Sequence, residues 1–255
     1  MSRCVCVFGE VLFDHFPGGQ RVLGGAPFNV AWHLQAFGEN PLFVSRVGCD
    51  PQGDEVRAAM QRWGMSLQGV QSDDSLPTGS VVVSFENGEP DYEIVHPAAW
   101  DAIASPVQGV ECSLLYHGSL ALRSQQSRES LRELRASGDA TVFVDINLRP
   151  PWFERKVLLE ALDAAQWVKL NGLELDHLAP GKGEMQQRAH AFIEAHGLDG
   201  LILTHGAKGA SVTTSGGAHF ETQPERDIEI KDTVGAGDAL TSVMILGLAR
   251  CWPCL

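Results

Sequence analysis

The segment Asp232-Thr233-Val234-Gly235-Ala236-Gly237-Asp238-Ala239-Leu240 is the most informative stretch of the chain. Residues 241–249 follow it with apolar positions that suit a helix, so the segment predicts a glycine turn that opens a helix. Gly235 and Gly237 let the backbone approach a ligand closely, and the unpaired N–H groups of a helix N-terminus attract an anion. The segment therefore predicts a phosphate site beside a carboxylate, Asp238.

Asp238 has two interpretations. A carboxylate in an anion-binding turn repels phosphate, so its presence there needs a chemical reason. In the first interpretation it acts as a general base that accepts the proton of an attacking hydroxyl. In the other interpretation Asp238 caps the helix and the glycines form an ordinary turn. The motif alone does not separate a general base from a cap.

Upstream of this turn, short apolar runs alternate with segments of helical periodicity. This pattern is typical of an α/β fold in which helices cover a parallel sheet. No repeat or long linker divides the chain, so we expect a single domain over residues 1–255. The expected strands are 4–8, 42–47, 114–116, 141–145, 167–170 and 201–204, and the expected helices lie near 30–37, 131–138 and 185–195.

The segment Gly79–Ile94 differs from this alternation. Two strand-like runs flank Asn87-Gly88, a dipeptide that is typical of a β-hairpin turn. The hairpin could form a flap over a site or extend the edge of the main sheet.

Composition excludes several classes of protein. Among the 255 residues, 44% are hydrophobic, which is enough for a sizeable core, and the net charge of −13 disfavours a nucleic-acid binder. No apolar run approaches the length of a membrane span and no signal peptide is evident, so we expect a cytoplasmic protein without membrane or nucleic-acid partners. Six cysteines are too few for a disulfide scaffold, and the isolated Cys251/Cys254 pair predicts neither a zinc nor a redox site.

Five further motifs carry polar residues or glycines, four of them at the ends of expected strands and one at the start of an expected helix. They are Gly9-Glu10-Val11-Leu12-Phe13-Asp14, Gly24-Gly25-Ala26-Pro27-Phe28-Asn29-Val30-Ala31, Asp145-Ile146-Asn147-Leu148-Arg149-Pro150-Pro151-Trp152, Lys169-Leu170-Asn171-Gly172-Leu173-Glu174-Leu175 and Thr204-His205-Gly206-Ala207-Lys208-Gly209-Ala210. In this order, from Gly9 to about Ala249, the chain resembles the ribokinase-like (PfkB) carbohydrate kinases, most closely their fructokinase branch. The resemblance implies a three-layer α/β/α domain with a parallel sheet, and a small β lid formed by segments near 10–23 and 78–110.

The first three motifs are those that the resemblance assigns to the sugar. A carboxylate accepts two hydroxyl donors at once, an amide both donates and accepts, and a guanidinium can grip an oxyanion with two parallel hydrogen bonds. Taken singly, these residues would be a loop aspartate, a helix start and a solvated arginine. The implied substrate-binding residues are Asp14, Gly24, Gly25, Asn29 and Arg149.

The last two motifs are those that the resemblance assigns to MgATP. Magnesium prefers oxygen ligands and retained waters, which fits Asn171 and Glu174 acting through water. Without the resemblance, Asn171 and Glu174 form a helix cap, and Thr204 begins an ordinary turn into a hairpin closed near Ser215. The implied nucleotide-binding residues are Lys169, Asn171, Glu174, Thr204, Gly206 and Gly209.

Together the motifs predict an ATP-dependent sugar kinase. Asp238 would take the proton of a primary hydroxyl, while the N–H groups of Gly235, Ala236 and Gly237 stabilise the transferred phosphoryl group. The branch favours fructose, with 2-keto-3-deoxygluconate or another small sugar as alternatives. A catalytically impaired sugar-binding protein is a second class. A dinucleotide-dependent oxidoreductase is disfavoured because no Gly-x-Gly-x-x-Gly follows the first strand.

The resemblance leaves three further points open. Family members continue beyond the helix after Asp238, whereas this sequence stops at Leu255, so we expect weakened ATP binding. Lids of related kinases often meet across a dimer, which makes a homodimer through the lid one expected arrangement. A requirement for a monovalent cation is also left open.

Overall fold

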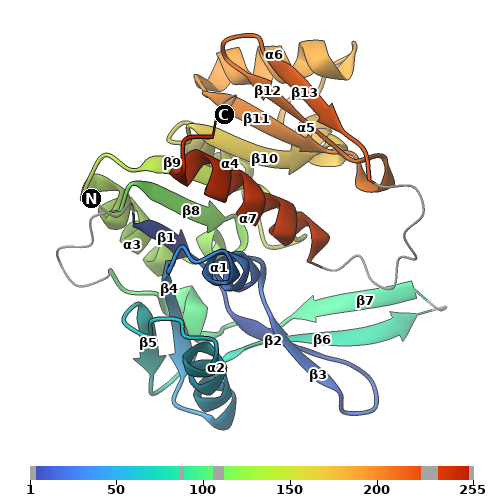
Figure 1. The fold of residues 1–255 in the computed structure, drawn as a ribbon. Helices are drawn as coiled ribbons and strands as arrows, with labels where there is room; N and C mark the ends of the chain where they lie inside the picture. The colour runs from blue at the N-terminus through green and yellow to red at the C-terminus, as the bar shows by residue number, and fades with distance from the viewer. Residues whose placement is uncertain (1–3, 87–88, 106–111, 225–234, 253–255) are drawn as a thin grey trace.

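The computed structural model describes residues 4–86, 89–105, 112–224 and 235–252. Most of its strands form one large sheet, and four others form a small sheet (Figure 1). The large sheet contains β1 (Val5–Phe8), β4 (Leu42–Gly48), β5 (Val70–Asp73), β8 (Leu114–Gly118), β9 (Thr141–Asp145), β10 (Trp167–Asn171), β11 (Gly200–Thr204), β12 (Ala210–Thr214) and β13 (His219–Thr222). The small sheet contains β2 (Leu12–His15), β3 (Arg21–Gly24), β6 (Gly79–Glu86) and β7 (Glu89–Ile94). The helices are α1 (Ala26–Ala36), α2 (Pro51–Arg62), α3 (Gln125–Ala136), α4 (Arg155–Leu162), α5 (Gly172–Leu178), α6 (Met185–His196) and α7 (Ala236–Ala249), with 3-10 turns η1 (Ala99–Ala102), η2 (Leu120–Arg123) and η3 (Gly206–Lys208).

The large sheet has the order β13-β12-β11-β10-β9-β8-β1-β4-β5. Its pairs are parallel from β5 to β11, which confirms the six strands expected from the sequence. The last two pairs, β11 with β12 and β12 with β13, are antiparallel. Short turns link these last strands, and a parallel crossover needs a dozen or more residues. The sheet is therefore mixed and mostly parallel.

Side chains that alternate along the buried strands build two helix layers. On β1, Val5 and Val7 face a core with residues of α1, α2 and α7. Cys6 and Phe8 face the opposite side, where the core includes residues of α3 and α4, and α5 and α6 cover the later strands on that side. Because strands buried on both faces carry near-continuous apolar runs, this arrangement explains why the expected strands were recognisable. It confirms the three-layer α/β/α fold.

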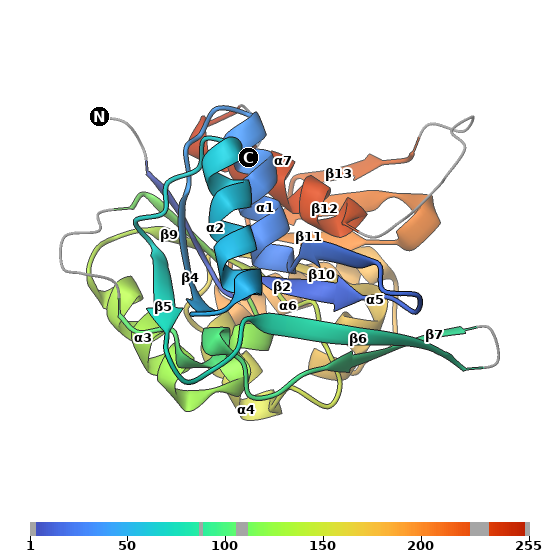
Figure 2. The ribbon, with the colours of Figure 1, turned by 90° about the horizontal axis from the view of Figure 1, so that it is seen from below.

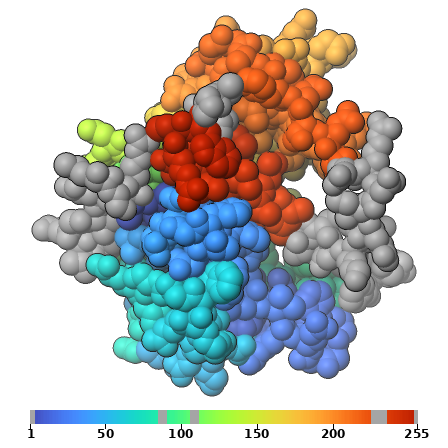
Figure 3. Space-filling view, viewed as in Figure 1, coloured from blue at the N-terminus to red at the C-terminus, as the bar shows by residue number. Residues whose placement is uncertain are grey.

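Helices α1 and α7 lie side by side although they come from opposite ends of the sequence. Figure 3 shows them in contact across one face of the molecule, α1 in blue and α7 in red. Arg250, just after α7, donates to Glu39 at 2.7 Å and to the carbonyl oxygen of Phe37, just after α1. The pair therefore brings two distant segments to one edge of the sheet.

The small sheet stands apart from the large one and projects from one side of it (Figures 1 and 2). Its order is β3-β2-β6-β7, and Asp14 on β2 is flanked by Val22 on β3 and Val81 on β6. Strands β6 and β7 form the antiparallel pair expected for the segment 79–94, and the turn at residues 87–88 lies outside the described residues. The pair belongs to this separate sheet rather than to the edge of the large one.

Some classes of site are absent from the described part of the chain. No helix there is both long enough and apolar enough to span a bilayer. The same residues contain no cluster of three or more histidine, cysteine or carboxylate side chains that could hold a metal ion. Cys4, Cys6, Cys49 and Cys112 are free thiols, and Cys254 lies outside the described residues.

Candidate active site

The carboxyl ends of the parallel strands bring several motif residues to one edge of the large sheet. Asp145 ends β9, Asn171 ends β10 and Thr204 ends β11. Asn171 and Thr204 are paired neighbours in the register of β10 and β11. Ligands of open α/β sheets bind in crevices at this edge, so the edge is where a site is expected.

The N-terminus of α7 carries Asp238. Gly235 is the N-cap, with φ of 80°, and no side chain caps this helix end. A left-handed φ favours glycine, which explains Gly235 in the motif. Asp238 lies inside the first turn and its Oδ2 accepts a 2.8 Å hydrogen bond from Asn29 Nδ2. Asp238 therefore does not cap the helix, and residues 232–234 of the motif lie outside the described residues.

The surroundings of Asp238 make it more basic than an exposed aspartate. Burial is the main cause of its raised pKa, and the charge of Asp145 acts in the same direction. The Asn29 hydrogen bond and the charges of Lys169 and Arg149 oppose this rise. Such a carboxylate remains able to accept a proton and is influenced by two cations.

The residues predicted to bind sugar lie around Asp238. A Cβ added to Gly24 would be 3.7 Å from Asp14 Oδ2 and 3.8 Å from Asn29 Oδ1, so both polar side chains lie next to Gly24. Gly25 has φ of 107°, and a Cβ there would lie 2.9 Å from the carbonyl oxygen of Glu10. The motif Gly24-Gly25 thus allows close packing between α1 and the segment after β1.

Arg149 and Glu10 complete the charged surroundings. Arg149 is exposed, and within the described part of the chain its Nη1 donates to the neighbouring carbonyl oxygen of Leu148, at 3.1 Å. Its charge helps to lower the pKa values of Asp14 and Asp238, although burial raises both. Glu10 was missed in the sequence analysis. It is buried, burial raises its pKa to about 7, and its Oε2 has no hydrogen-bond partner among the described residues. An acidic residue two positions after the buried strand β1 was the available signal.

Lys169 was predicted to contact the nucleotide, and the structure places it in a buried ion pair. Its Nζ lies 2.7 Å from Asp145 Oδ2, with 9% and 1% of the two side chains exposed. A Cβ added to Gly237 would be 3.5 Å from the same Nζ. Lys169 therefore lies beneath the first turn of α7, and its partner Asp145, quoted in a motif but given no role, is a second residue that the sequence analysis missed.

Asn171 and Glu174 form the helix cap that was the alternative to a metal site. Asn171 Oδ1 accepts from the N–H of Glu174 at 3.0 Å, and the N–H of Asn171 donates to Glu174 Oε2 at 2.8 Å. Glu174 Oε1 accepts from the N–H of Leu148 at 2.8 Å. Every side-chain oxygen of the pair already accepts a backbone N–H, so a metal ion would have to use the remaining lone pairs or a bridging water.

The Thr204–Gly209 turn combines two kinds of glycine. Gly206 has φ of 59° and a Cβ there would meet nothing within 4 Å. Gly209 has φ of 100°, and a Cβ there would collide with the carbonyl oxygen of Thr222 on β13. Gly209 is thus required by packing of the β12–β13 hairpin, while Gly206 leaves open space at the edge.

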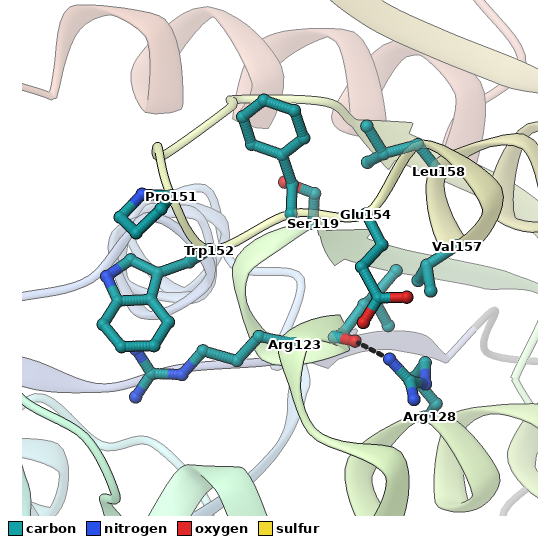
Figure 4. A pocket seen from close by; sticks show the side chains of 10 residues that line it. Ser119, Arg123, Arg128, Pro151, Trp152, Glu154, Val157 and Leu158 are labelled. Carbon is teal, nitrogen blue, oxygen red and sulfur yellow. Dashed lines mark hydrogen bonds between the residues drawn. The ribbon is translucent and has the colours of Figure 1, made fainter.

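A separate cavity of about 130 Å³ opens beside the loop that follows β9 (Figure 4). One wall is Arg123, whose guanidinium is held between the rings of Trp100 and Trp152, at 4.0 and 4.5 Å from their centroids. Arg123 also donates two hydrogen bonds to Asp101, at 2.7 and 2.8 Å. None of the predicted site residues lines this cavity, whose lining is Ser119, Leu122, Arg123, Arg128, Pro151, Trp152, Phe153, Glu154, Val157 and Leu158.

A known protein family matches nearly the whole chain. The sequence matches the family model described as pfkB family carbohydrate kinase over residues 9–254. The chain belongs to this family. This carbohydrate kinase is 29% identical over 267 residues to the fructokinase of Salmonella typhimurium, covering 98% of this chain and 85% of that protein.

Solved structures share the fold of this carbohydrate kinase. The crystal structure of fructokinase with bound ATP from Xylella fastidiosa has a TM-score of 0.86 at 24% identity, covering 99% of this chain and 83% of that one. The fructokinase from Vibrio cholerae in its fructose, ADP and calcium ion bound form has a TM-score of 0.82 at 24% identity, covering 97% and 84%. These likenesses confirm the ribokinase-like architecture.

Proposed function

We propose that this carbohydrate kinase transfers the γ-phosphate of ATP to a primary hydroxyl of fructose, with Asp238 as the general base. The observation that carries the proposal is the 2.8 Å hydrogen bond from Asn29 to Asp238, with Asp14 and Asn29 both next to Gly24. Two side chains that can bind sugar hydroxyls, Asp14 and Asn29, thus lie near the basic carboxylate of Asp238. The Salmonella relative and the fructose-bound Vibrio neighbour support fructose as the sugar.

The mechanism follows from these positions. Asp14 and Asn29 would orient the sugar so that one hydroxyl faces Asp238, which takes its proton as the oxygen attacks the γ-phosphorus. The new O–P bond forms while the bond from that phosphorus to the bridging oxygen breaks, which releases ADP. The N–H groups of Gly235, Ala236 and Gly237 would hold the negative charge of the transferred group. Positioning and electrostatics supply the catalysis.

Arg149 is the cation that we assign to the substrate. Among the described residues it has no ion-pair partner, and although burial raises the pKa values of Asp14 and Asp238, the charge of Arg149 acts to lower both. We assign it to the transferred phosphate, where a planar guanidinium can bind two oxygens. The exposed side chain would turn inward when the phosphate is present.

The nucleotide would lie along the ends of β10 and β11, over Asn171, Thr204, Gly206 and Gly209. Asn171 and Glu174 fit a Mg²⁺ ion held through water, because their oxygens already accept backbone N–H groups. Such an ion would neutralise phosphate charge. A requirement for a monovalent cation would be shown by faster turnover in potassium salts.

The small sheet would cover the sugar as a lid and meet a second copy in a homodimer. Asp14 belongs to this sheet, so movement of the sheet would move a residue that is proposed to bind the sugar. Val22, Val82 and Tyr92 on the sheet are 44%, 45% and 52% exposed, and a second copy could cover such apolar side chains. Light scattering that finds only a monomer at micromolar concentration would rule out the dimer.

A panel of sugars with MgATP tests the proposed function. We expect ADP formation to be fastest with fructose and slower with 2-keto-3-deoxygluconate and ribose. Faster turnover of another sugar would change the substrate and keep the kinase mechanism. Sugar binding by calorimetry with no ADP formation from any sugar would instead indicate a binding protein on this fold.

A further inference from the structure

Two consecutive hydroxyls, those of Thr241 and Ser242, contact the turn of α7 that carries Asp238. Thr241 Oγ1 lies 2.9 Å from the carbonyl oxygen of Gly237, and Ser242 Oγ lies 2.7 Å from that of Asp238. Neither residue has exposed surface. The two hydroxyls therefore hold the backbone of Gly237, proposed to bind the phosphate, and of Asp238, proposed to accept the proton.

Each hydroxyl also faces a second acceptor outside α7. Thr241 Oγ1 lies 3.2 Å from Asp145 Oδ2 at the end of β9, and Ser242 Oγ lies 3.4 Å from the carbonyl oxygen of Val30 on α1. A hydroxyl has one proton, so each shares it between its two acceptors. Asp145 Oδ2 is itself fixed by Lys169 Nζ at 2.7 Å. The first turn of α7 is thus connected both to the sheet and to α1.

Packing alone does not account for these two residues. Serine and threonine are weak helix formers, and a buried hydroxyl costs stability unless it is hydrogen-bonded. The next turn of α7 buries Met244 and Ile245, as expected for a helix packed against a sheet. Hydroxyl bonds to the carbonyl four residues back slightly destabilise and bend helices. The polar pair therefore adjusts the start of α7 at some cost to the helix itself.

We propose that Thr241 and Ser242 are positioning residues for phosphoryl transfer, and we name the pair the hydroxyl clamp. The clamp fixes the first turn of α7 against Asp145 and α1, and so aligns the N–H groups of the turn with the Asp238 carboxylate. Both hydroxyls are fully buried, so each would act through the backbone of the turn and not on the substrate itself. The inference rests on the proposed role of Asp238 and extends it to the residues that hold it in place.

The clamp predicts a particular kinetic pattern. A displacement of about 1 Å at a reacting group can cost as much as about 100-fold in rate, whereas the sugar is bound by residues of other elements. Thr241→Val keeps the shape of the side chain and removes the hydroxyl. We expect it to lower kcat with fructose about tenfold with little change in KM for the sugar, and we expect Thr241→Ser to retain kcat within about twofold of the parent value.

Amide hydrogen exchange at residues 239–242 provides a measurement that does not need turnover. Thr241→Val should exchange faster there than the parent, while amides of α3 and α6 stay unchanged because the rest of the fold is intact. Ser242→Ala should produce a similar effect through the loss of its contact with Val30, and it carries the test if Thr241→Val fails to fold.

The two proposals can fail separately. If the parent phosphorylated no sugar, the proposed function would be wrong, and the exchange measurement would still decide whether the clamp holds the turn. If the parent is active, parental kcat and parental exchange in both Thr241→Val and Ser242→Ala would overturn the clamp. A fall in kcat that Thr241→Ser shares equally would also overturn it, because the hydroxyl would then not be the cause.

Discussion

Asn29 Nδ2 donates a 2.8 Å hydrogen bond to Asp238 Oδ2, across 209 residues of sequence. The donor lies in the first turn of α1 and the acceptor in the first turn of α7. The contact is therefore between the starts of two helices that pack side by side. It joins the residue proposed to hold the sugar to the residue proposed to activate it.

Asp238→Asn should abolish most of the kinase activity. The amide keeps the shape of the side chain and loses its basicity, and general-base catalysis is typically worth about 10²–10⁴-fold. We expect kcat with fructose to fall by about that factor, measured by ADP release. Asp139→Asn, an exposed position before β9, is the matched control and should keep full activity. Parental turnover by the Asp238 variant would refute the assignment of the base.

Asn29→Leu should shift the acidic limb of the pH profile. The Asn29 hydrogen bond favours the ionised form of Asp238, so its loss raises the pKa of that carboxyl beyond the effect of burial. The base is then ionised only at higher pH, and the acidic limb of kcat/KM moves upward. Gln35→Leu, later on α1, should leave the limb in place. An unshifted limb in the Asn29 variant would mean that the hydrogen bond does not tune the base.

Glu10→Gln should change how stability depends on pH. Burial raises the pKa of Glu10 from 4.5 to about 7, so in the parent the unfolded state loses its proton first as the pH rises. Parent stability should therefore fall between about pH 4.5 and 7, by about 3 kcal/mol for this group alone. The variant should be flatter over that range and more stable than the parent at pH 8. Urea unfolding of parent and variant at pH 5 and pH 8 measures the pH dependence and the difference in stability at pH 8. The exposed Glu194→Gln serves as control. Equal pH dependence in parent and variant would contradict the raised pKa.

Gly209→Ala should destabilise the protein far more than Gly206→Ala. Both residues have positive φ, but only at Gly209 would the new methyl group meet another atom, the carbonyl oxygen of Thr222. We expect about 1 kcal/mol for Gly206→Ala from backbone strain and about 3 kcal/mol or more for Gly209→Ala. Thermal unfolding of the two variants gives the comparison. Equal losses would show that the steric contact is not what requires glycine at 209.

The strands could be predicted from the sequence because they are apolar on both faces. Val5 and Val7 face one helix layer and Cys6 and Phe8 the other, which gives a continuous run that is easy to recognise. The antiparallel end of the sheet was harder to place, since the pairing of β11, β12 and β13 depends on the length of two turns.

The site could be predicted where a motif fixes local backbone, and less well where side chains meet across the fold. Gly235 and Gly25 have the left-handed φ values that their motifs suggest. The Lys169–Asp145 pair could not be foreseen, because nothing in a single sequence states that the ends of β9 and β10 face the first turn of α7. Glu10 was overlooked because an acidic residue just after a strand is usually exposed, and the sequence alone does not show that this one is buried.

The packing of α1 on α7 has a consequence for biosynthesis. A ribosome releases Asp14 and Asn29 early and Asp238 late, so a nascent chain exposes the start of α1 long before α7 exists to cover it. The apolar side of α1 and the strands beneath it, including Leu34 and Phe43, must then wait for α7 or be shielded by a chaperone. Phosphoryl transfer should appear only after α7 has been synthesised and has packed on α1.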